Sequence, residues 1–171
     1  MLRNCAADII GCIAKTTVPK GQWPDLMTFL GKCTESETPQ LRNVGIRLLG
    51  DIMEPLLESS SGKALKGSFM VTVGNSLLNP NNPLEVKRTA AYAISKLIKF
   101  LDDEKDLVAF RDTYLPEFLK TTQAAIQEGD TETVVTCYET FTDIMEIVIN
   151  NKTQSIFSEI VWYVNIICIF L

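Results

Sequence analysis

The chain has 171 residues, of which 46% are hydrophobic, so it is long and apolar enough to bury the core of an ordinary domain. Its 21 acidic residues outnumber its 16 basic residues and give a net charge of -5, which argues against nucleic acid or a membrane surface as the main partner. Histidine is absent, which excludes Ser-His-Asp and Cys-His catalysis and histidine-liganded zinc. Because a glycine-rich phosphate loop is also lacking, the sequence predicts no enzyme and no cofactor.

The first half of the chain shows helical patterns separated by turn residues. Residues 2–18 form a helical pattern that carries Arg3 and Asp8, which do not suit the apolar core of a secretory signal. The next helix is expected over residues 22–33, with Pro24 in its first turn. A further helix is expected from residue 39 to about residue 59, with Thr38 as its N-cap and Pro55 as a kink or an early end.

The second half continues in the same way. Turn clusters at residues 60–62, 79–83, 102–103 and 128–130 predict helices over residues 63–78, 84–101, 105–127 and 131–149. Pro116 should divide or bend the third of these helices. Residues 160–171 are strongly apolar but fall well short of the roughly 20 residues that a membrane span needs, so they predict a core helix. No stretch alternates with the period of a β-strand.

The sequence repeats itself at regular intervals. Residues 2–13 recur 39 positions later at 41–52, again 45 positions further on at 86–97, and more faintly after another 47 positions at 133–144. These intervals are typical of HEAT repeats, whose paired helices occupy about 40–47 residues. The sequence therefore predicts an all-α HEAT-repeat solenoid, a right-handed superhelix of antiparallel helix pairs. It divides into a half repeat at 1–18, repeats at about 21–59, 62–101 and 105–150, and a partial repeat at 152–171.

Two template positions of the repeat have predicted structural roles. A small residue, at Ala6, Gly45 and Ala90, should let a neighbouring helix approach closely. A basic residue near the start of each helix, at Arg3, Arg42 and Lys87, should bond to neighbouring loops. The five cysteines, Cys5, Cys12, Cys33, Cys137 and Cys168, are odd in number and show no CxxC spacing, so we expect reduced core residues.

Charged residues also align between the repeats. One column contains Cys12, Asp51, Lys96 and Asp143, and a second, one helical turn on, contains Lys15, Glu54, Lys99 and Glu146. One interpretation is a ladder of salt bridges that fixes the repeat register, with each exposed pair contributing about 0.2–1 kcal/mol. The other is that two acidic faces bind basic side chains of a partner, one with Asp51, Glu54 and Glu58 and the other with Glu139, Asp143 and Glu146. A double charge reversal at Glu54 and Lys99 separates the two, because only a ladder tolerates the swap.

Three segments resemble a known family: residues 2–14 (LRNCAADIIGCIA), 21–30 (GQWPDLMTFL) and 39–52 (PQLRNVGIRLLGDI). With the Trp23-Pro24 pair opening an outer helix, they resemble the early HEAT repeats of the importin beta, or karyopherin beta, nuclear transport receptors, particularly the importin-4 and importin-5 kind. The resemblance extends over residues 1–152 and implies an N-terminal fragment of a longer receptor. Both ends of the chain fall within a repeat, as expected of a fragment.

The resemblance also implies partners and a location. Receptors of this family bind protein cargo with basic signals, Ran-GTP and nucleoporins, and they move between cytoplasm and nucleus, whereas neither nucleic acid nor membrane is expected as a partner. The acidic faces above and the neighbouring Lys96 and Lys99 are the residues expected to contact such partners. The alternative function is a structural HEAT-repeat scaffold that assembles other protein subunits.

Overall fold

The computed structural model describes residues 2–59, 62–101 and 103–150, with the side chains of the first helix described from residue 9 onward. Every regular element in these ranges is a helix, which confirms the prediction of an all-α repeat fold. The chain forms two compact units, Met1–Leu97 and Ile98–Leu171. The acidic residues on α3 therefore belong to the first unit, and those on α8 belong to the second.

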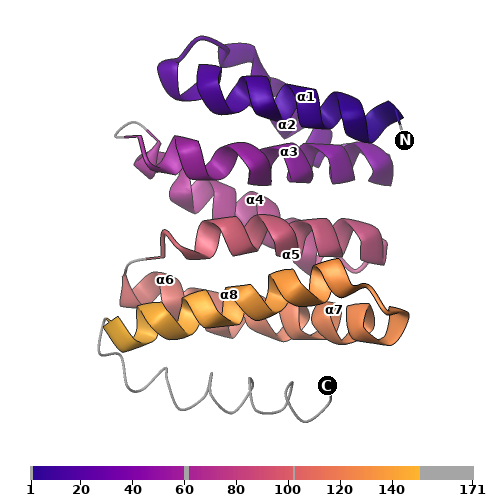
Figure 1. Ribbon diagram of the computed structural model, residues 1–171, viewed down its shortest axis with the longest axis vertical. Helices are drawn as coiled ribbons and strands as arrows, with labels where there is room; N and C mark the ends of the chain where they lie inside the picture. The colour runs from indigo at the N-terminus through magenta and orange to yellow at the C-terminus, as the bar shows by residue number, and fades with distance from the viewer. Residues whose placement is uncertain (1, 60–61, 102, 151–171) are drawn as a thin grey trace. The chain divides into compact units, whose positions relative to one another are not determined.

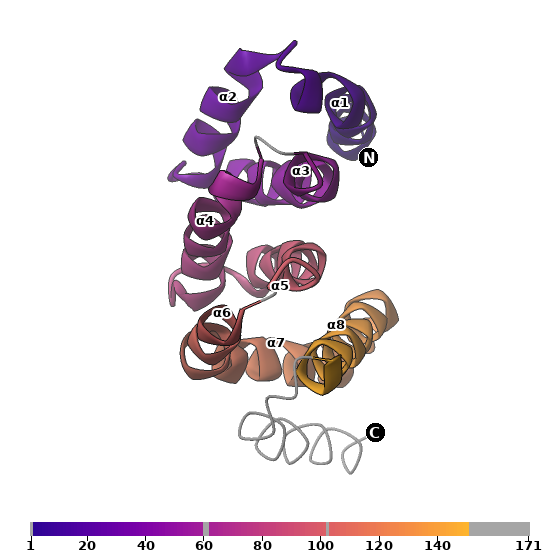
Figure 2. The same ribbon diagram turned by 90° about the vertical axis from the view of Figure 1, so that its left-hand side faces the viewer.

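The first unit contains five α-helices, labelled in Figure 1: α1 (Leu2–Thr17), α2 (Pro24–Thr34), α3 (Pro39–Leu57), α4 (Lys66–Leu78) and α5 (Leu84–Ile98). Short 3-10 turns, η1 (Val18–Lys20) and η2 (Lys63–Leu65), connect them. Figure 2 shows α1, α3 and α5 in one layer and α2 and α4 in the other. Helix α3 packs against both α1 and α2, so each repeat contributes one helix to each layer.

Gly45 allows close packing between the two layers. A Cβ atom at this position would lie 2.6 Å from the Cβ atom of Cys33 on α2, so α3 can approach α2 this closely only without a side chain here. Ala90, the equivalent residue of α5, is completely buried. These observations confirm the role predicted for the small template residue at Gly45, while at Ala90 they show only burial, and the Ala6 side chain lies outside the described residues.

Arg42 joins two successive turns of the first unit. Its Nη1 atom donates to the carbonyl oxygens of Ser36 at 2.7 Å and Glu37 at 2.9 Å, in the turn before α3. Its Nε atom donates at 2.8 Å to Oδ1 of Asn82, in the turn before α5, and Asn82 in turn donates to the Ser76 carbonyl at 2.7 Å. The predicted loop-bonding role of the basic template residue is therefore confirmed at Arg42.

The second unit contains α6 (Glu104–Ala109), a π-helical segment η3 (Phe110–Tyr114), α7 (Leu115–Glu128) and α8 (Thr131–Asn150). Phe118 lies at the centre of its core, with ring centroids 6.3 Å from Phe110 and 5.6 Å from Phe141, both edge-on. Pro116 lies in the first turn of α7, directly after the π-helical segment, which confirms the predicted division of this helix. The wider π turn accommodates a residue that has no N–H to donate.

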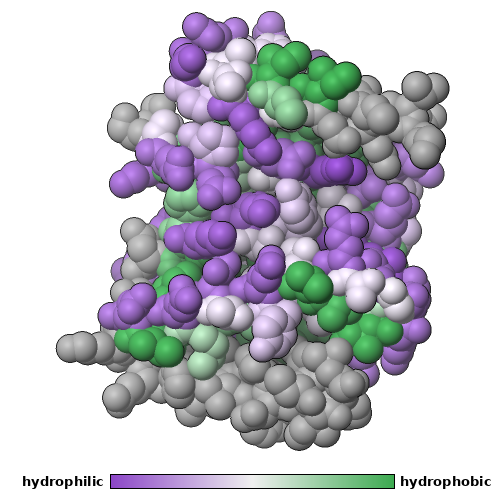
Figure 3. Space-filling model, viewed as in Figure 1, coloured by the Kyte–Doolittle hydropathy of each residue, from purple (hydrophilic) through white to green (hydrophobic). Residues whose placement is uncertain are grey.

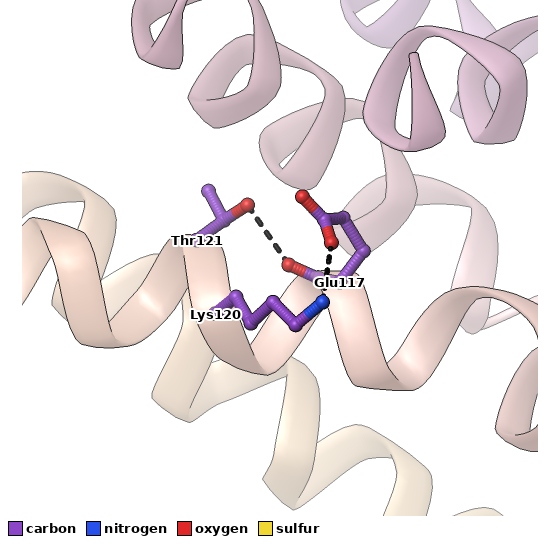
Figure 4. Close-up of polar contacts among 3 residues, drawn as sticks. All are labelled: Glu117, Lys120 and Thr121. Atoms are coloured by element: carbon purple, nitrogen blue, oxygen red, sulfur yellow. Dashed lines mark hydrogen bonds and ion pairs between the residues drawn. The ribbon is translucent and has the colours of Figure 1, made fainter. Parts of the chain in front are cut away.

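Two polar contacts on α7 join residues of the same helix. Figure 4 shows Lys120 paired with Glu117 at 3.2 Å, three residues apart, and the Thr121 hydroxyl bonded to the Glu117 carbonyl at 2.9 Å. The Lys120 side chain is 72% exposed, so the pair contributes only about 0.3–0.5 kcal/mol to stability.

Two predicted helix ends differ from the structure. Pro55 does not end α3, which continues to Leu57 even though a proline cannot donate to the carbonyl one turn earlier. Helix α5 was expected to reach Leu101 but ends at Ile98, and the buried Leu101 closes the following turn by donating to the Ile98 carbonyl. Asp103 does not simply stop α5. It caps the start of α6, with its carboxylate accepting from the backbone N–H of Lys105 and Asp106.

The cysteines differ from one another. Cys33 and Cys137 are buried as predicted, and burial raises the pKa of both thiols, to about 11 at Cys137. Cys12 is exposed, so the prediction of a core role was wrong there. It lies on the exposed face of α1 with the column of aligned charged residues, and not on the apolar face that packs against other helices. The Cys5 side chain and Cys168 lie outside the described residues.

The apolar stretch at 160–171 and the partial repeat at 152–171 also lie outside the described residues. Among the residues that the structure does describe, no helix is both long enough and apolar enough to cross a membrane.

Candidate protein-binding groove

A groove of about 380 Å³ crosses the layer formed by α1, α3 and α5. We call it the acidic groove, and its lining residues are Lys15, Gly50, Asp51, Glu54, Pro55, Glu58, Tyr92 and Lys96. All of them lie in the first unit and come from corresponding helices of three successive repeats. Its volume falls within the roughly 300–1,000 Å³ of binding pockets in general.

Asp51 lines the groove and connects neighbouring helices. The Tyr92 hydroxyl on α5 donates to its Oδ1 atom at 2.8 Å. A Cβ atom added to Gly11 on α1 would lie 3.4 Å from its Oδ2 atom, so Asp51 reaches α1 as well. Gly50 makes room for the bond, because a Cβ atom there would lie only 3.2 Å from the Tyr92 ring. The carboxylate of Asp51 therefore has a structural role in joining α3 to α5.

The ammonium group of Lys96 lies beside the ring of the same tyrosine. Its Nζ atom is 5.3 Å from the centroid of the Tyr92 ring, within the range of a cation–π interaction. The structure thus brings Asp51 and Lys96 together, as the aligned column predicts. Tyr92 mediates between them, with its hydroxyl on the carboxylate and its ring beside the ammonium group.

Glu54 and Glu58 are the exposed carboxylates of the groove. They follow Asp51 by three and seven residues, so Glu54 shares the face of α3 that carries Asp51, and Glu58 comes directly after the last residue of that helix. Lys15 of α1 adds a second ammonium group to that of Lys96, so the lining carries more negative than positive charge. In Figure 3, which shows this layer of the first unit, hydrophilic residues spread over α3 and α5, while apolar residues gather over part of α1.

The remaining candidate residues lie in the second unit. Glu139, Asp143 and Glu146 share one face of α8, with Glu139 and Glu146 exposed and Asp143 half-buried. Lys99 was predicted to lie one helical turn beyond Lys96, but it lies in the turn after α5 because that helix ends at Ile98. It is exposed, and it does not continue the helical column.

Tyr92 is the groove residue that the sequence analysis missed. In the aligned repeats its position is occupied by Asp8 and Arg47, so the repeat comparison gave no signal. The available signal was local, because Tyr92 and Lys96 are four residues apart on a predicted helix and must share a face. A tyrosine and a lysine at this spacing indicate a cation–π pair.

The stacked helix pairs and the open, polar groove define a class of helical-repeat protein. A family model described as "IPO5-like, TPR repeats" matches residues 1–158, and the chain belongs to this family of repeat proteins. The description names TPR repeats, whose period is about 34 residues, whereas the copies here recur at the longer intervals typical of HEAT repeats. Both are built from stacked helix pairs.

One curated relative supports the same assignment. A protein of Dictyostelium discoideum named "Probable importin-5 homolog" is 21% identical over 128 residues, which make up 75% of this chain and 12% of that protein. The chain thus spans about an eighth of the length of this relative. No solved structure matches the chain.

Proposed function

We propose that the chain is a segment of a nuclear transport receptor, which works in the cytoplasm and nucleus and binds protein cargo with basic signals, Ran-GTP and nucleoporins. Membership of the IPO5-like repeat family and the similarity to a protein named as an importin-5 homologue support this proposal. The stacking of helices also supports it, because helical repeats present extended surfaces to protein partners. The whole chain is proposed as one solenoid fragment, divided into the repeats given above.

The observation that carries the proposal is the exposure of Glu54 and Glu58 at the acidic groove. An ionised carboxylate accepts charge-assisted hydrogen bonds from lysine and arginine, and these are about twice as strong as bonds between neutral groups. The Asp51 carboxylate already accepts a hydrogen bond from the Tyr92 hydroxyl, so its main contribution to binding is its negative charge. We therefore assign the direct contacts with a basic partner to Glu54 and Glu58, and the electrostatic attraction to all three acidic residues.

Glu139, Asp143 and Glu146 on α8 form a second proposed contact surface of the same chemistry. It belongs to the second unit, so the two surfaces suit a cargo with more than one basic segment. Lys96 and Lys99 remain proposed partner-binding residues, Lys99 as a contact of opposite charge and Lys96 through its place in the acidic groove. Two surfaces that bind one flexible partner gain affinity by effective concentration, without any new contact.

The proposal predicts that removing the two exposed charges weakens binding of a basic peptide. The test is a titration of fluorescein-labelled nona-lysine with the full chain, followed by fluorescence anisotropy. The double variant Glu54→Gln and Glu58→Gln should lose about 1–2 kcal/mol, or roughly five- to thirtyfold in affinity, because two charge-assisted contacts become neutral. The loss should shrink at high salt, since exposed charges are screened there.

A matched control separates the groove from net charge. Glu35 and Glu37 are exposed in the turn between α2 and α3, outside the groove, and Glu35→Gln with Glu37→Gln removes the same charge. This control variant should change the affinity by less than about twofold. Equal losses in the two double variants would show that the peptide senses only the net charge of the chain, and the groove would not be its site.

A further inference from the structure

We propose that Tyr92 is a docking surface for one arginine side chain of the basic partner, and that Lys96 is an internal cation which this arginine displaces. The inference rests on the proposed function, namely that a basic partner binds the acidic groove. It adds a specific residue pair that sets the affinity and the preference for arginine over lysine. The starting observation is that the chain's own ammonium group already occupies the aromatic site.

The geometry makes Tyr92 suitable for a cation. The bond from its hydroxyl to Oδ1 of Asp51, 2.8 Å long, holds the ring in one orientation and places a negative charge at its edge. The Nζ atom of Lys96, 5.3 Å from the ring centroid, shows that the ring is accessible to an ammonium group. Glu54 and Glu58 line the same groove, so a cation that arrives at Tyr92 finds carboxylates within one pocket.

Displacement of Lys96 requires little free energy. The Lys96 side chain is half-buried and flexible, and its ammonium group can return to water when it leaves the ring. A guanidinium group is planar, less strongly hydrated than an ammonium group and able to stack on an aromatic ring while bonding to a carboxylate. An arginine therefore gains more at this site than Lys96 does, whereas a lysine of the partner only replaces one ammonium group by another.

The test compares two lysines of the same groove. Lys96→Gln removes the internal cation, and Lys15→Gln removes the same charge from the α1 side of the groove. Fluorescein-labelled nona-arginine and nona-lysine are titrated into the full chain and followed by anisotropy. Lys96→Gln should tighten nona-arginine binding about three- to tenfold more than Lys15→Gln does, because it frees the aromatic site as well as removing a charge.

A second comparison removes the ring itself. Tyr92→Leu should reduce the preference for nona-arginine over nona-lysine to the part that the carboxylates supply, while Tyr92→Phe, which keeps the ring, should retain most of it. Thermal unfolding of each variant confirms that it is folded, and the comparison of the two lysines does not depend on the tyrosine variants. Equal effects of Lys96→Gln and Lys15→Gln would contradict the proposal that an arginine of the partner displaces Lys96 from Tyr92.

The result also separates this inference from the proposed function. If neutralising Glu54 and Glu58 weakens peptide binding while the two lysine variants behave alike, the acidic groove stands and the role of Lys96 is wrong. If neutralising Glu54 and Glu58 has no effect, the proposed function of the groove fails first. A preference for nona-arginine that is as large in Tyr92→Leu as in the unchanged chain excludes Tyr92 as the docking surface.

Discussion

Single residues decide how closely the helices of the first unit approach. Gly45 is the clearest case, because the space that a side chain would need is filled by Cys33 of the neighbouring helix. The sequence allowed this role to be predicted, since a small residue recurs at the same template position in each clear copy of the repeat. Tyr92 is the opposite case, because its role depends on a partner in the preceding repeat and no aligned residue resembles it.

Replacement of Gly45 by alanine tests the packing at the residue scale. Because the new Cβ atom would lie 2.6 Å from the Cβ atom of Cys33, we expect Gly45→Ala to destabilise the chain by about 1–3 kcal/mol. Gly31 on α2 is the matched control, because a Cβ atom there meets nothing within 4 Å. Gly31→Ala should stabilise the chain by about 0.5–1 kcal/mol through its better helix propensity. Urea unfolding measures both, and effects of the same sign would contradict the packing account.

The boundaries of the elements were predicted unevenly. Pro39 marked the first residue of α3, and Pro24 and Pro116 lie in the first turns of α2 and α7, where a missing N–H costs little. Helix α2 was nevertheless expected from residue 22, and α7 as part of one helix over residues 105–127. The end of α5 was misplaced because the burial of Leu101 in the following turn is a tertiary effect, which periodicity does not reveal. The end of α3 was hard to predict because Pro55 indicated a kink or an early end, whereas the helix continues through it to Leu57.

The connection between repeats rests largely on Arg42, and its removal tests it. Arg42→Ala deletes three hydrogen bonds to two turns and leaves the buried Asn82 short of a donor, so we expect a loss of about 2–3 kcal/mol in stability. Lys120→Ala, which removes an exposed local pair on α7, should change stability by less than about 0.5 kcal/mol. Chemical denaturation distinguishes the two, and an Arg42→Ala effect as small as that of Lys120→Ala would show that the turns do not depend on this side chain.

At the scale of the whole molecule, the interval between repeats was the feature of the sequence that predicted most of the fold. Matching segments at 2–13, 41–52 and 86–97 predicted α1, α3 and α5, and the structure places these three helices side by side in one layer. The position of the acidic groove follows from that layer, because residues that align between repeats come to lie next to one another. The repeat pattern did not reveal the cavity itself or the bond between Tyr92 and Asp51, which depend on unlike residues at neighbouring positions.

The proposal that the chain is a segment of a nuclear transport receptor has one direct measurement. The full chain is immobilised and exposed to Ran locked in the GTP state and, in parallel, to Ran-GDP, and the retained Ran is quantified. The account predicts selective retention of Ran-GTP, whereas a structural scaffold that assembles other subunits would have no reason to distinguish the two nucleotide states. Retention of neither form, or equal retention of both, would contradict the assignment of this segment to Ran-dependent transport.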